Sequence, residues 1–220
     1  WRSEIQCFMT YAAIFFDLDG TLVNTIDLYE EVMIELIRSL GVPYSTHNFR
    51  HDYIHGTHTA DILRSHSIPE GEIADFRERR DRLYERRLRE RVRFYPGAEK
   101  VLTHLRGHLP LGLVTGSWRG YLRAIDERTN ILSHFTVTIA ADDTAPDHKP
   151  HPRGLLSAAK TLEVRPTECL YVGDQRFDVE AAHNAGMQSC LLMSEYTPFD
   201  AHRYADFTVV DGLEELLRLL

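Results

Sequence analysis

The sequence predicts an α/β protein in which a Rossmann-like parallel sheet forms the core and an all-helical unit is inserted into it. From Tyr95 onward, short apolar runs alternate with helical stretches, a pattern typical of parallel sheets covered by helices. An apolar run with strand character, Ala12 to Phe16, stands near the start. Between Thr25 and Arg93 no strand pattern occurs, and apolar residues recur at helical spacing. The expected boundaries are residues 1–24 and 95–220 for the core and residues 25–94 for the helical cap.

The helical cap is predicted to begin and end with long helices. Asn24 or Thr25 can serve as the N-cap of the first helix, and Gly41 ends it. Its apolar positions are Tyr29, Val32, Met33, Leu36, Ile37 and Leu40. The remaining segments expected here are a polar, irregular stretch from Pro43 to about Pro69, a short helix within it at about Thr59 to Ser65, and a second long helix from about Glu70 to Arg91.

The core is predicted to add further strands, each connected to the next by a helical segment. The expected strands are Leu111–Val114, Thr136–Ala140, Cys169–Val172, Ser189–Met193 and Phe207–Val210. The expected helices cover residues 97–105, 120–127, 152–162, 177–185 and 213–220, and the third and the last of them have apolar residues along one face.

Composition restricts the partners that the chain is expected to have. With 220 residues, of which 43% are hydrophobic, the chain can bury a substantial core. Its net charge of −8 argues against nucleic acid and anionic membranes, although a small anionic substrate needs only a locally positive pocket. No window reaches the roughly 18 consecutive apolar residues of a membrane span. The first ten residues also lack a signal-peptide pattern, so we expect a cytoplasmic protein. We separately expect it to be monomeric or homodimeric.

The three cysteines are expected to be reduced and structural. Cys7, Cys169 and Cys190 show no metal-ligand spacing, and the last two fall in strand-like runs, where a thiol behaves as a small core residue.

Two carboxylates directly follow the first apolar run. Residues i and i+2 of an extended chain point the same way, so Asp17 and Asp19 are expected to project together where the strand ends. Gly20 and Thr21 then allow the chain to turn. Acidic side chains at the carboxyl end of a parallel strand suit a hard cation such as magnesium. On these residues alone, a solvated Asp-rich turn is an equal alternative.

Reactive side chains also follow three other predicted strands or their loops. They are Thr115, Gly116 and Ser117 after the second strand, Lys149 in the loop after the third, and Gly173, Asp174 and Asp178 after the fourth. Because parallel strands deliver their carboxyl ends to one edge of a sheet, these groups are expected to converge with the acidic pair.

Four segments carry a family resemblance. FFDLDGTLVNT, LVTGSW, HKPHP and GDQRFDVEAAHNAG resemble, in order, the four motifs of the haloacid dehalogenase superfamily. The chain is most similar to the superfamily's phosphatases with a helical, C1-type cap, the phosphoglycolate phosphatase-like group. The resemblance extends from about Ala12 to Leu192. It implies a phosphatase that hydrolyses a small phosphorylated metabolite.

The resemblance assigns the two acids of the first motif different roles. Asp17 matches the nucleophile, which attacks phosphorus and forms an aspartyl-phosphate intermediate. Asp19 matches the general acid/base, which protonates the leaving oxygen and later takes a proton from water. The family binds Mg²⁺ through the nucleophile carboxylate, the backbone carbonyl of the second acid and the acid of the fourth motif, here Asp174.

The same resemblance implies the remaining roles. Thr115 and Lys149, with backbone N–H groups at Gly116 and Ser117, would bind the phosphoryl oxygens. Asp178 would orient a metal-bound water or the lysine. Taken singly, the two hydroxyl residues fit caps of the next helix, the lysine an exposed loop, and the acid an ordinary first helical turn.

Two positions depart from the family pattern. Asn24 stands where these phosphatases often carry Asp, which is tolerable because either residue can cap a helix. Gln175 replaces the usual small hydroxyl residue after Asp174, which puts the hydrogen bonding around that acid in doubt.

Several other activities of the superfamily are weighed by single features. Asp19 argues against dehalogenases, which lack an acid at that position, and the absence of lysine between Thr25 and Tyr95 argues against a Schiff-base phosphonoacetaldehyde hydrolase. A phosphomutase resembling β-phosphoglucomutase, or a pyrophosphatase, stays an alternative, as does a catalytically silent regulator that binds a phosphorylated ligand.

Polar clusters in the helical cap have competing interpretations. His51, His55 and His58 lie where related enzymes contact substrate, and we take His58 as the substrate-binding candidate, whereas zinc is disfavoured because Gly56 interrupts their alignment. The Arg77–Arg93 run holds nine arginines and four acids, which favours a solvated helix face over a nucleic-acid site.

Overall fold

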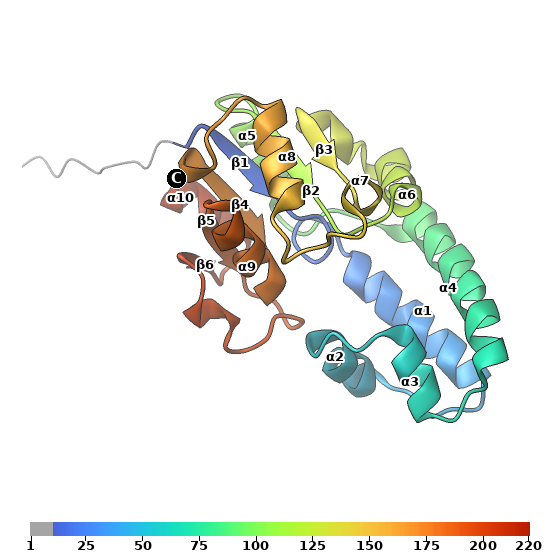
Figure 1. The fold of residues 1–220 in the computed structure, drawn as a ribbon. Helices are drawn as coiled ribbons and strands as arrows, with labels where there is room; N and C mark the ends of the chain where they lie inside the picture. The colour runs from blue at the N-terminus through green and yellow to red at the C-terminus, as the bar shows by residue number, and fades with distance from the viewer. Residues whose placement is uncertain (1–10) are drawn as a thin grey trace, which may run out of the picture.

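A six-stranded sheet forms the centre of the computed structural model, which describes residues 11–220 (Figure 1). The strands are β1 (Ala13–Phe16), β2 (Leu111–Val114), β3 (Val137–Ile139), β4 (Cys169–Gly173), β5 (Gln188–Leu192) and β6 (Phe207–Val209). They run parallel in the order β3-β2-β1-β4-β5-β6. The predicted fold class is confirmed, and each predicted strand is present within two residues of its expected ends.

Helices cover both faces of the sheet. Neighbouring residues of β1 point to opposite faces, so they belong to different apolar clusters. Ile14 and Phe16 belong to one apolar cluster, and Ala13 and Phe15 belong to another. The first cluster includes residues of α5 (Ala98–Leu105), α6 (Arg119–Thr129) and α10 (Leu216–Leu219). The second includes residues of α8 (Arg153–Thr161) and α9 (Arg176–Ala185). A further short helix is α7 (Ala141–Thr144), and the 3-10 turns are η1 (Ile131–His134), η2 (Pro166–Glu168), η3 (Ala201–Arg203) and η4 (Leu213–Glu215).

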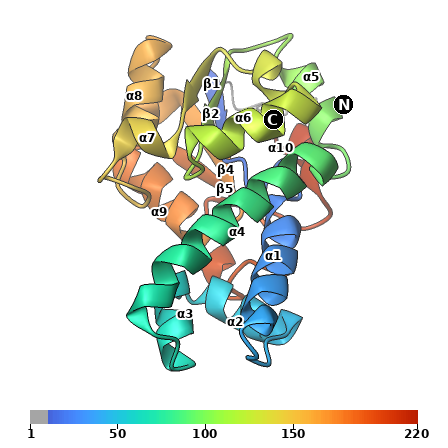
Figure 2. The same ribbon diagram turned by 90° about the vertical axis from the view of Figure 1, so that its right-hand side faces the viewer.

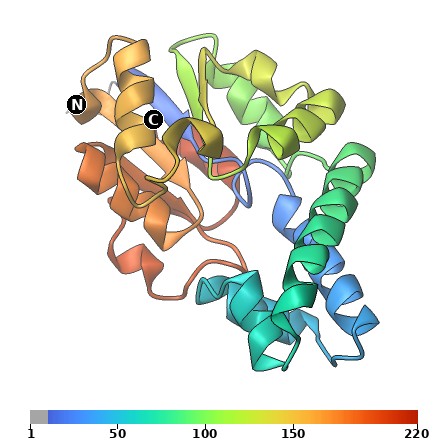
Figure 3. The ribbon, with the colours of Figure 1, turned by 45° about the vertical axis from the view of Figure 1, so that its right-hand side comes forward.

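The register of the central strands aligns their carboxyl ends. Phe16 of β1 lies opposite Leu113 of β2 and Val172 of β4, so the three strands finish at the same level. The residues that follow them therefore emerge at one edge of the sheet, as expected for a parallel α/β core. In Figures 1 and 3 this edge faces the helices inserted between β1 and β2.

The inserted segment is helical throughout its regular parts. It contains α1 (Thr25–Ser39), α2 (Thr46–Ile54), α3 (Thr59–Ser65) and α4 (Glu70–Arg91). Figure 2 shows α1 and α4 side by side, with α2 and α3 at the end away from the sheet, and α4 also packs against α6. No helix within residues 11–220 is long and apolar enough to cross a membrane.

Helix α2 corrects the expectation of an irregular stretch after Pro43. A capping box starts it: the Ser45 side chain accepts from the Asn48 backbone N–H, and Asn48 Oδ1 accepts from the Ser45 N–H at 3.0 Å. Phe49 is its one buried residue, so the helix has no apolar stripe that a periodicity argument could detect.

Two other local expectations hold only in part. Asn24 occupies the N-cap position of α1, but its side chain makes no capping bond and instead accepts from the Arg93 N–H at 2.8 Å, which ties together the two ends of the inserted segment. The C-terminal helix is shorter than expected, because residues 213–215 form a 3-10 turn before α10.

The cysteines that the structure describes are structural, as expected. Cys169 and Cys190 are buried and free, and burial raises their thiol pKa values to about 11 and about 12. The prediction for Cys7 lies outside the described residues.

Candidate active site

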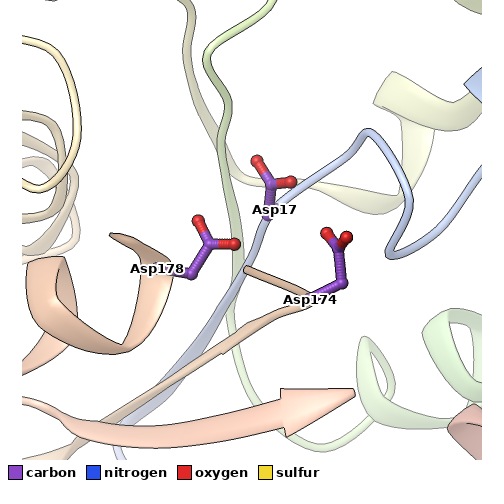
Figure 4. Close-up of side chains that lie close together, drawn as sticks. All are labelled: Asp17, Asp174 and Asp178. Atoms are coloured by element: carbon purple, nitrogen blue, oxygen red, sulfur yellow. The ribbon is translucent and has the colours of Figure 1, made fainter. Parts of the chain in front are cut away.

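Asp17 directly follows β1 and extends its pairing with β4. Its backbone N–H donates to the Val172 carbonyl at 2.8 Å, which fixes the backbone, and the side chain is nearly completely buried. Figure 4 shows its carboxylate facing those of Asp174, after β4, and Asp178, in the first turn of α9. One carboxylate oxygen from each residue lies within 4.8 Å of the others.

The turn after Asp19 depends on glycine. Gly20 has a φ of +79°, and a Cβ atom there would lie 2.6 Å from Asp174 Oδ2 and 2.3 Å from the Ile26 side chain. The next residue, Thr21, donates from its hydroxyl to Asp174 Oδ1 at 3.0 Å. The DGT segment therefore turns the chain and also holds the acid of the neighbouring strand.

Asp19 faces the group after β2 rather than the Asp17 cluster. Thr115 Oγ1 donates to Asp19 Oδ2 at 3.1 Å and accepts from the Ser117 backbone N–H at 3.0 Å. Neither hydroxyl residue caps α6, because Trp118 is its N-cap residue and no side chain makes a capping bond. The capping interpretation is therefore wrong.

Lys149 is the cation of the site. Its ammonium group lies 2.6 Å from Asp17 Oδ1, 2.6 Å from Asp178 Oδ1 and 3.0 Å from the Tyr171 hydroxyl, and only 11% of its side chain is exposed. Burial lowers the pKa of this amine, but the two carboxylates outweigh burial and hold the pKa well above its ordinary value. The exposed-loop interpretation is wrong.

Asp178 uses both carboxylate oxygens within the protein. Oδ1 accepts from Lys149, and Oδ2 accepts from the Gln175 backbone N–H at 3.0 Å. The second bond caps α9, so the ordinary helix-turn role is present together with the contact to the lysine. Gly173 makes room for this side chain, since a Cβ atom there would lie 2.5 Å from it.

Gln175 supplies the hydrogen bond that the sequence left in doubt. Its Nε2 donates to Asp174 Oδ2 at 2.6 Å and to the Tyr196 carbonyl at 3.1 Å. Thr197 donates from its hydroxyl to the Asp174 carbonyl at 2.8 Å. The longer amide therefore holds Asp174 and also connects it to the loop after β5.

The three acids form a site that fits a hard divalent cation. Burial raises the pKa of Asp17 well above its ordinary value, although Lys149 opposes the rise. Burial, with a further contribution from Asp178, raises the pKa of Asp174 to about 7. The three carboxylates thus carry more negative charge than Lys149 neutralises. Their oxygen atoms are the kind of ligand that Mg²⁺ prefers.

A cavity of about 410 Å³ joins these residues to the inserted helices. From the predicted set, Asp17, Asp19, Gly116, Ser117 and Lys149 line it. The inserted helices contribute Tyr29, Tyr53, Arg80, Asp81 and Tyr84, and the core contributes Trp118, Tyr121 and Phe177.

The sequence alone predicts no role in the site for these aromatic and charged cavity residues. Tyr29 is only an apolar position of the first predicted helix, and Arg80 is only part of the arginine run. Tyr171, the lysine's third partner, lies in the buried strand β4 and gave no sequence signal beyond apolar character.

The structure does not bring His58 to this cavity. It is the exposed N-cap residue of α3 and is not among the lining residues. His51 and His55 are also exposed and stack on one another with ring centroids 4.3 Å apart. Within residues 11–220, these three histidines are not part of a three-residue group that could hold a metal ion.

Most of the arginine run lies on a solvated helix face, as expected. Arg82 pairs with Glu78 and Arg89 pairs with Glu85, each four residues apart along α4. Arg80 is the exception described above, because it reaches the cavity.

Comparisons with known proteins agree with this arrangement. Residues 14–192 match the family described as haloacid dehalogenase-like hydrolase. A phosphoglycolate phosphatase from Vibrio vulnificus is 30% identical over 217 residues, which cover 93% of each chain. A solved structure from Lactobacillus plantarum, provisionally named a phosphoglycolate phosphatase, is 28% identical with a TM-score of 0.80 and covers 96% of this chain and all of its own.

A further solved structure shares the fold. CbbY from Rhodobacter sphaeroides, solved in complex with phosphate, has a TM-score of 0.77 at 23% identity and covers 94% of this chain and 96% of its own. The sheet order, the four strand-end motifs and the family match lead to one conclusion: the chain belongs to the haloacid dehalogenase-like hydrolases and is a phosphatase.

Proposed function

We propose that the protein is a Mg²⁺-dependent phosphomonoesterase that hydrolyses a small phosphorylated metabolite through a phosphoryl group carried on Asp17. The observation that carries this proposal is the separate placement of the two acids of the first motif. Asp17 lies with Lys149, Asp174 and Asp178, whereas the Asp19 side chain lies with Thr115.

In the first step, a carboxylate oxygen of Asp17 attacks phosphorus, and the bond from phosphorus to the leaving alcohol breaks. Asp19 gives its proton to the leaving oxygen. Lys149 balances the charge on the nucleophile and on the phosphoryl oxygens, and it is held for this task by Asp178.

In the second step, a water molecule attacks the phosphorus of aspartyl phosphate. Asp19 now takes the proton of that water, the bond between phosphorus and the Asp17 oxygen breaks, and inorganic phosphate leaves. Both acids return to their starting protonation states. Thr115 supports the proton-transfer role, because its hydroxyl bond holds the Asp19 carboxylate away from the metal-site acids.

The acids fit the metal that the family uses. Asp17 and Asp174 would hold it through their carboxylates and Asp19 through its backbone carbonyl, while both Asp178 oxygens already accept hydrogen bonds. When bound, Mg²⁺ neutralises negative charge on the nucleophile and on the transferring phosphoryl group.

The inserted helices would act as the cap that excludes water from the reaction. The division into a core of residues 1–24 and 95–220 and a cap of residues 25–94 is part of this proposal. It is supported by Tyr29, Tyr53 and Arg80, which bring the inserted segment to the catalytic cavity. A role for His58 would require a different cap position, and a cytoplasmic location and a monomeric or homodimeric state stay predictions.

Phosphate release from a panel of phosphomonoesters, with Mg²⁺ and with EDTA, tests this function. The panel includes phosphoglycolate, the substrate in the relatives' names, and sugar phosphates. We expect release only with metal and none from Asp17→Asn, whereas Asp75→Asn, an exposed acid of α4, should be active. Metal-independent release or an active Asp17→Asn enzyme would contradict the proposal. Interconversion of sugar phosphates without release would indicate a mutase, and no turnover of any compound would indicate the regulator.

A further inference from the structure

Aromatic side chains dominate the part of the cavity that extends beyond the catalytic residues. We propose that the substrate is a phosphomonoester whose alcohol part carries an uncharged ring of about nucleoside size, and that a small carboxylate such as phosphoglycolate is a poor substrate. This inference rests on the phosphatase activity proposed above and specifies its substrate class.

Three tyrosines form a continuous aromatic wall. The ring of Tyr84 lies edge to face with those of Tyr29 and Tyr121, at centroid distances of 5.2 Å and 5.0 Å. The Tyr84 hydroxyl donates to the Thr25 carbonyl, and the Tyr121 hydroxyl donates to Asp81 at 2.7 Å. Because these hydroxyls are engaged within the protein, the wall offers mainly ring surface to a ligand.

Two more aromatic residues line the same cavity from the core. Trp118, the last residue of the LVTGSW motif after β2, is 48% exposed, and Phe177, at the start of α9, is 41% exposed. Exposed aromatic side chains gathered in a cavity mark a binding surface, and aromatic faces are the surfaces on which planar rings stack. The Phe177 ring centroid lies 5.3 Å from Lys149 Nζ, so a ring bound against Phe177 would lie next to the phosphoryl group.

The two charged residues of this aromatic region, Arg80 and Asp81, neutralise each other. Arg80 donates from Nε and Nη2 to Asp81 Oδ1, at 2.9 Å and 2.6 Å. Its Nη1 donates to Thr59 Oγ1 at 3.1 Å and also lies 3.4 Å from the Tyr29 hydroxyl. All three guanidinium nitrogens therefore have partners within the cap, and only 18% of the side chain is exposed.

Among residues 11–220, the cavity wall holds no cation that is free to bind a second anionic group. Arg80 and Lys149 are the two basic residues among the described residues that line it, and Lys149 is paired with Asp17 and Asp178. A substrate carboxylate would have to displace Asp81 from Arg80, which breaks that ion pair and leaves Asp81, still bonded to Tyr121, as a second negative charge beside the substrate. A neutral alcohol avoids this conflict, and its hydroxyl groups can donate to the half-exposed Asp81.

The size of the cavity agrees with its chemistry. At about 410 Å³ it falls in the range of pockets that enclose drug-sized ligands. A two-carbon acid bound at Asp17 would leave the aromatic wall without a contact, whereas a ring-bearing alcohol reaches it.

Steady-state kinetics on matched substrates test the proposal. Adenosine and uridine 5′-monophosphate have an alcohol part with a ring, and phosphoglycolate has one with a carboxylate. Glycerol 3-phosphate is the reference, because its alcohol part is uncharged and has no ring. We expect kcat/KM for the nucleotides to exceed that for phosphoglycolate by about tenfold or more. A higher kcat/KM for phosphoglycolate would overturn this inference and leave the phosphatase proposal intact. Failure to release phosphate from all four, with release from a sugar phosphate, would overturn this inference alone, and failure with every phosphomonoester of the wider panel would remove both proposals.

A substitution on the core side tests the ring contact. Trp118→Ala is expected to raise KM for the nucleotides by about five- to one-hundredfold, through lost stacking, and to change KM for glycerol 3-phosphate much less. Phe199→Ala is the matched control, because Phe199 is 82% exposed and lies outside the cavity lining. An equal rise in KM for all substrates, or none, would contradict ring binding at this wall.

A substitution in the cap tests the exclusion of carboxylates. Asp81→Asn releases Arg80, so kcat/KM for phosphoglycolate should rise by about tenfold, the effect of a charge-assisted hydrogen bond. Asp75→Asn on the same helix, whose side chain is 66% exposed, should give no rise. An unchanged or lower kcat/KM for phosphoglycolate in Asp81→Asn would contradict the role given to the Arg80–Asp81 pair.

Discussion

The side-chain amide of Gln175 lies 2.6 Å from Asp174 Oδ2 and 3.1 Å from the Tyr196 carbonyl oxygen. Tyr196 packs in turn against Phe49 and Tyr53 of α2, with ring centroids 6.4 Å and 5.8 Å apart. One glutamine thus connects an acid of the proposed metal site to a loop that contacts α2. This is the position where the sequence departs from the small hydroxyl residue common in the family.

Removing this amide should weaken metal binding. Gln175→Ala takes a donor from Asp174 and is expected to raise the Mg²⁺ concentration for half-maximal activity by about tenfold or more, the usual effect of losing a bond to a metal ligand. A Mg²⁺ titration of phosphate release measures it. Gln188→Ala, at the start of β5, is the control, and equal Mg²⁺ dependence in both variants would contradict the assignment.

Lys149 should be needed for stability as well as activity. Lys149→Met leaves Asp17 and Asp178 without their buried cation, so the free energy of unfolding should fall by about 3 kcal/mol in the metal-free protein. Urea unfolding measures the change. Lys100→Met removes a lysine whose side chain is 70% exposed and pairs with Glu214, so it should cost at most about 1 kcal/mol. Similar losses in the two variants would show that the buried pairs do not stabilise the fold.

The metal-free protein should lose stability as pH rises towards 8. Asp174 has a pKa of about 7 when folded and about 3.8 when unfolded, so between these values the folded state binds more protons than the unfolded state. Its contribution is complete below pH 4 and is lost as pH rises through 7. Urea unfolding in EDTA from pH 5 to 8 measures this dependence.

Asp174→Asn tests the origin of that slope. The variant should show a flatter pH dependence and, at pH 8, a free energy of unfolding higher by about 2 kcal/mol or more. Added Mg²⁺ should stabilise the wild type more than the variant. A variant with the wild-type slope would show that another group causes the pH dependence.

Gly20 and Gly41 offer a matched test of the turn at the active site. Both have a φ of +79°, but a Cβ at Gly20 would collide with Ile26 and Asp174, whereas a Cβ at Gly41 would meet nothing within 4 Å. Gly41→Ala should cost only the backbone strain, about 1 kcal/mol, with normal activity. Gly20→Ala should cost more and should also lower activity, because Asp174 must shift. Equal stability and activity in the two variants would contradict this account.

The catalytic side of the site could be predicted because each of its residues follows a strand. The parallel sheet brings Asp17, Thr115, Lys149 and Asp174 together once the strand order is fixed, and the family motifs mark them. Hydrogen-bond partners such as Tyr171 could not be predicted, since they depend on side-chain packing behind the strand ends.

The cap side of the site could not be derived in the same way. Tyr29 and Arg80 lie on helices whose spacing shows which face is apolar, but their approach to the cavity depends on how α1 and α4 pack together and against the core. Helix α2 buries a single residue, so its sequence has no apolar periodicity that predicts a helix. The prediction of His58 as a substrate-binding residue depends only on its place in the sequence, and His58 is exposed at the start of α3.

The most direct test of the central claim is to find where the phosphoryl group resides during turnover. A reaction with Mg²⁺ and substrate is quenched in acid within the first turnovers, and the digested protein is analysed by mass spectrometry. The mechanism predicts one hydroxylamine-labile phosphoryl group on the peptide that contains Asp17, and none in Asp17→Asn. A phosphoryl group on another residue, or phosphate release by Asp17→Asn without an intermediate, would contradict it.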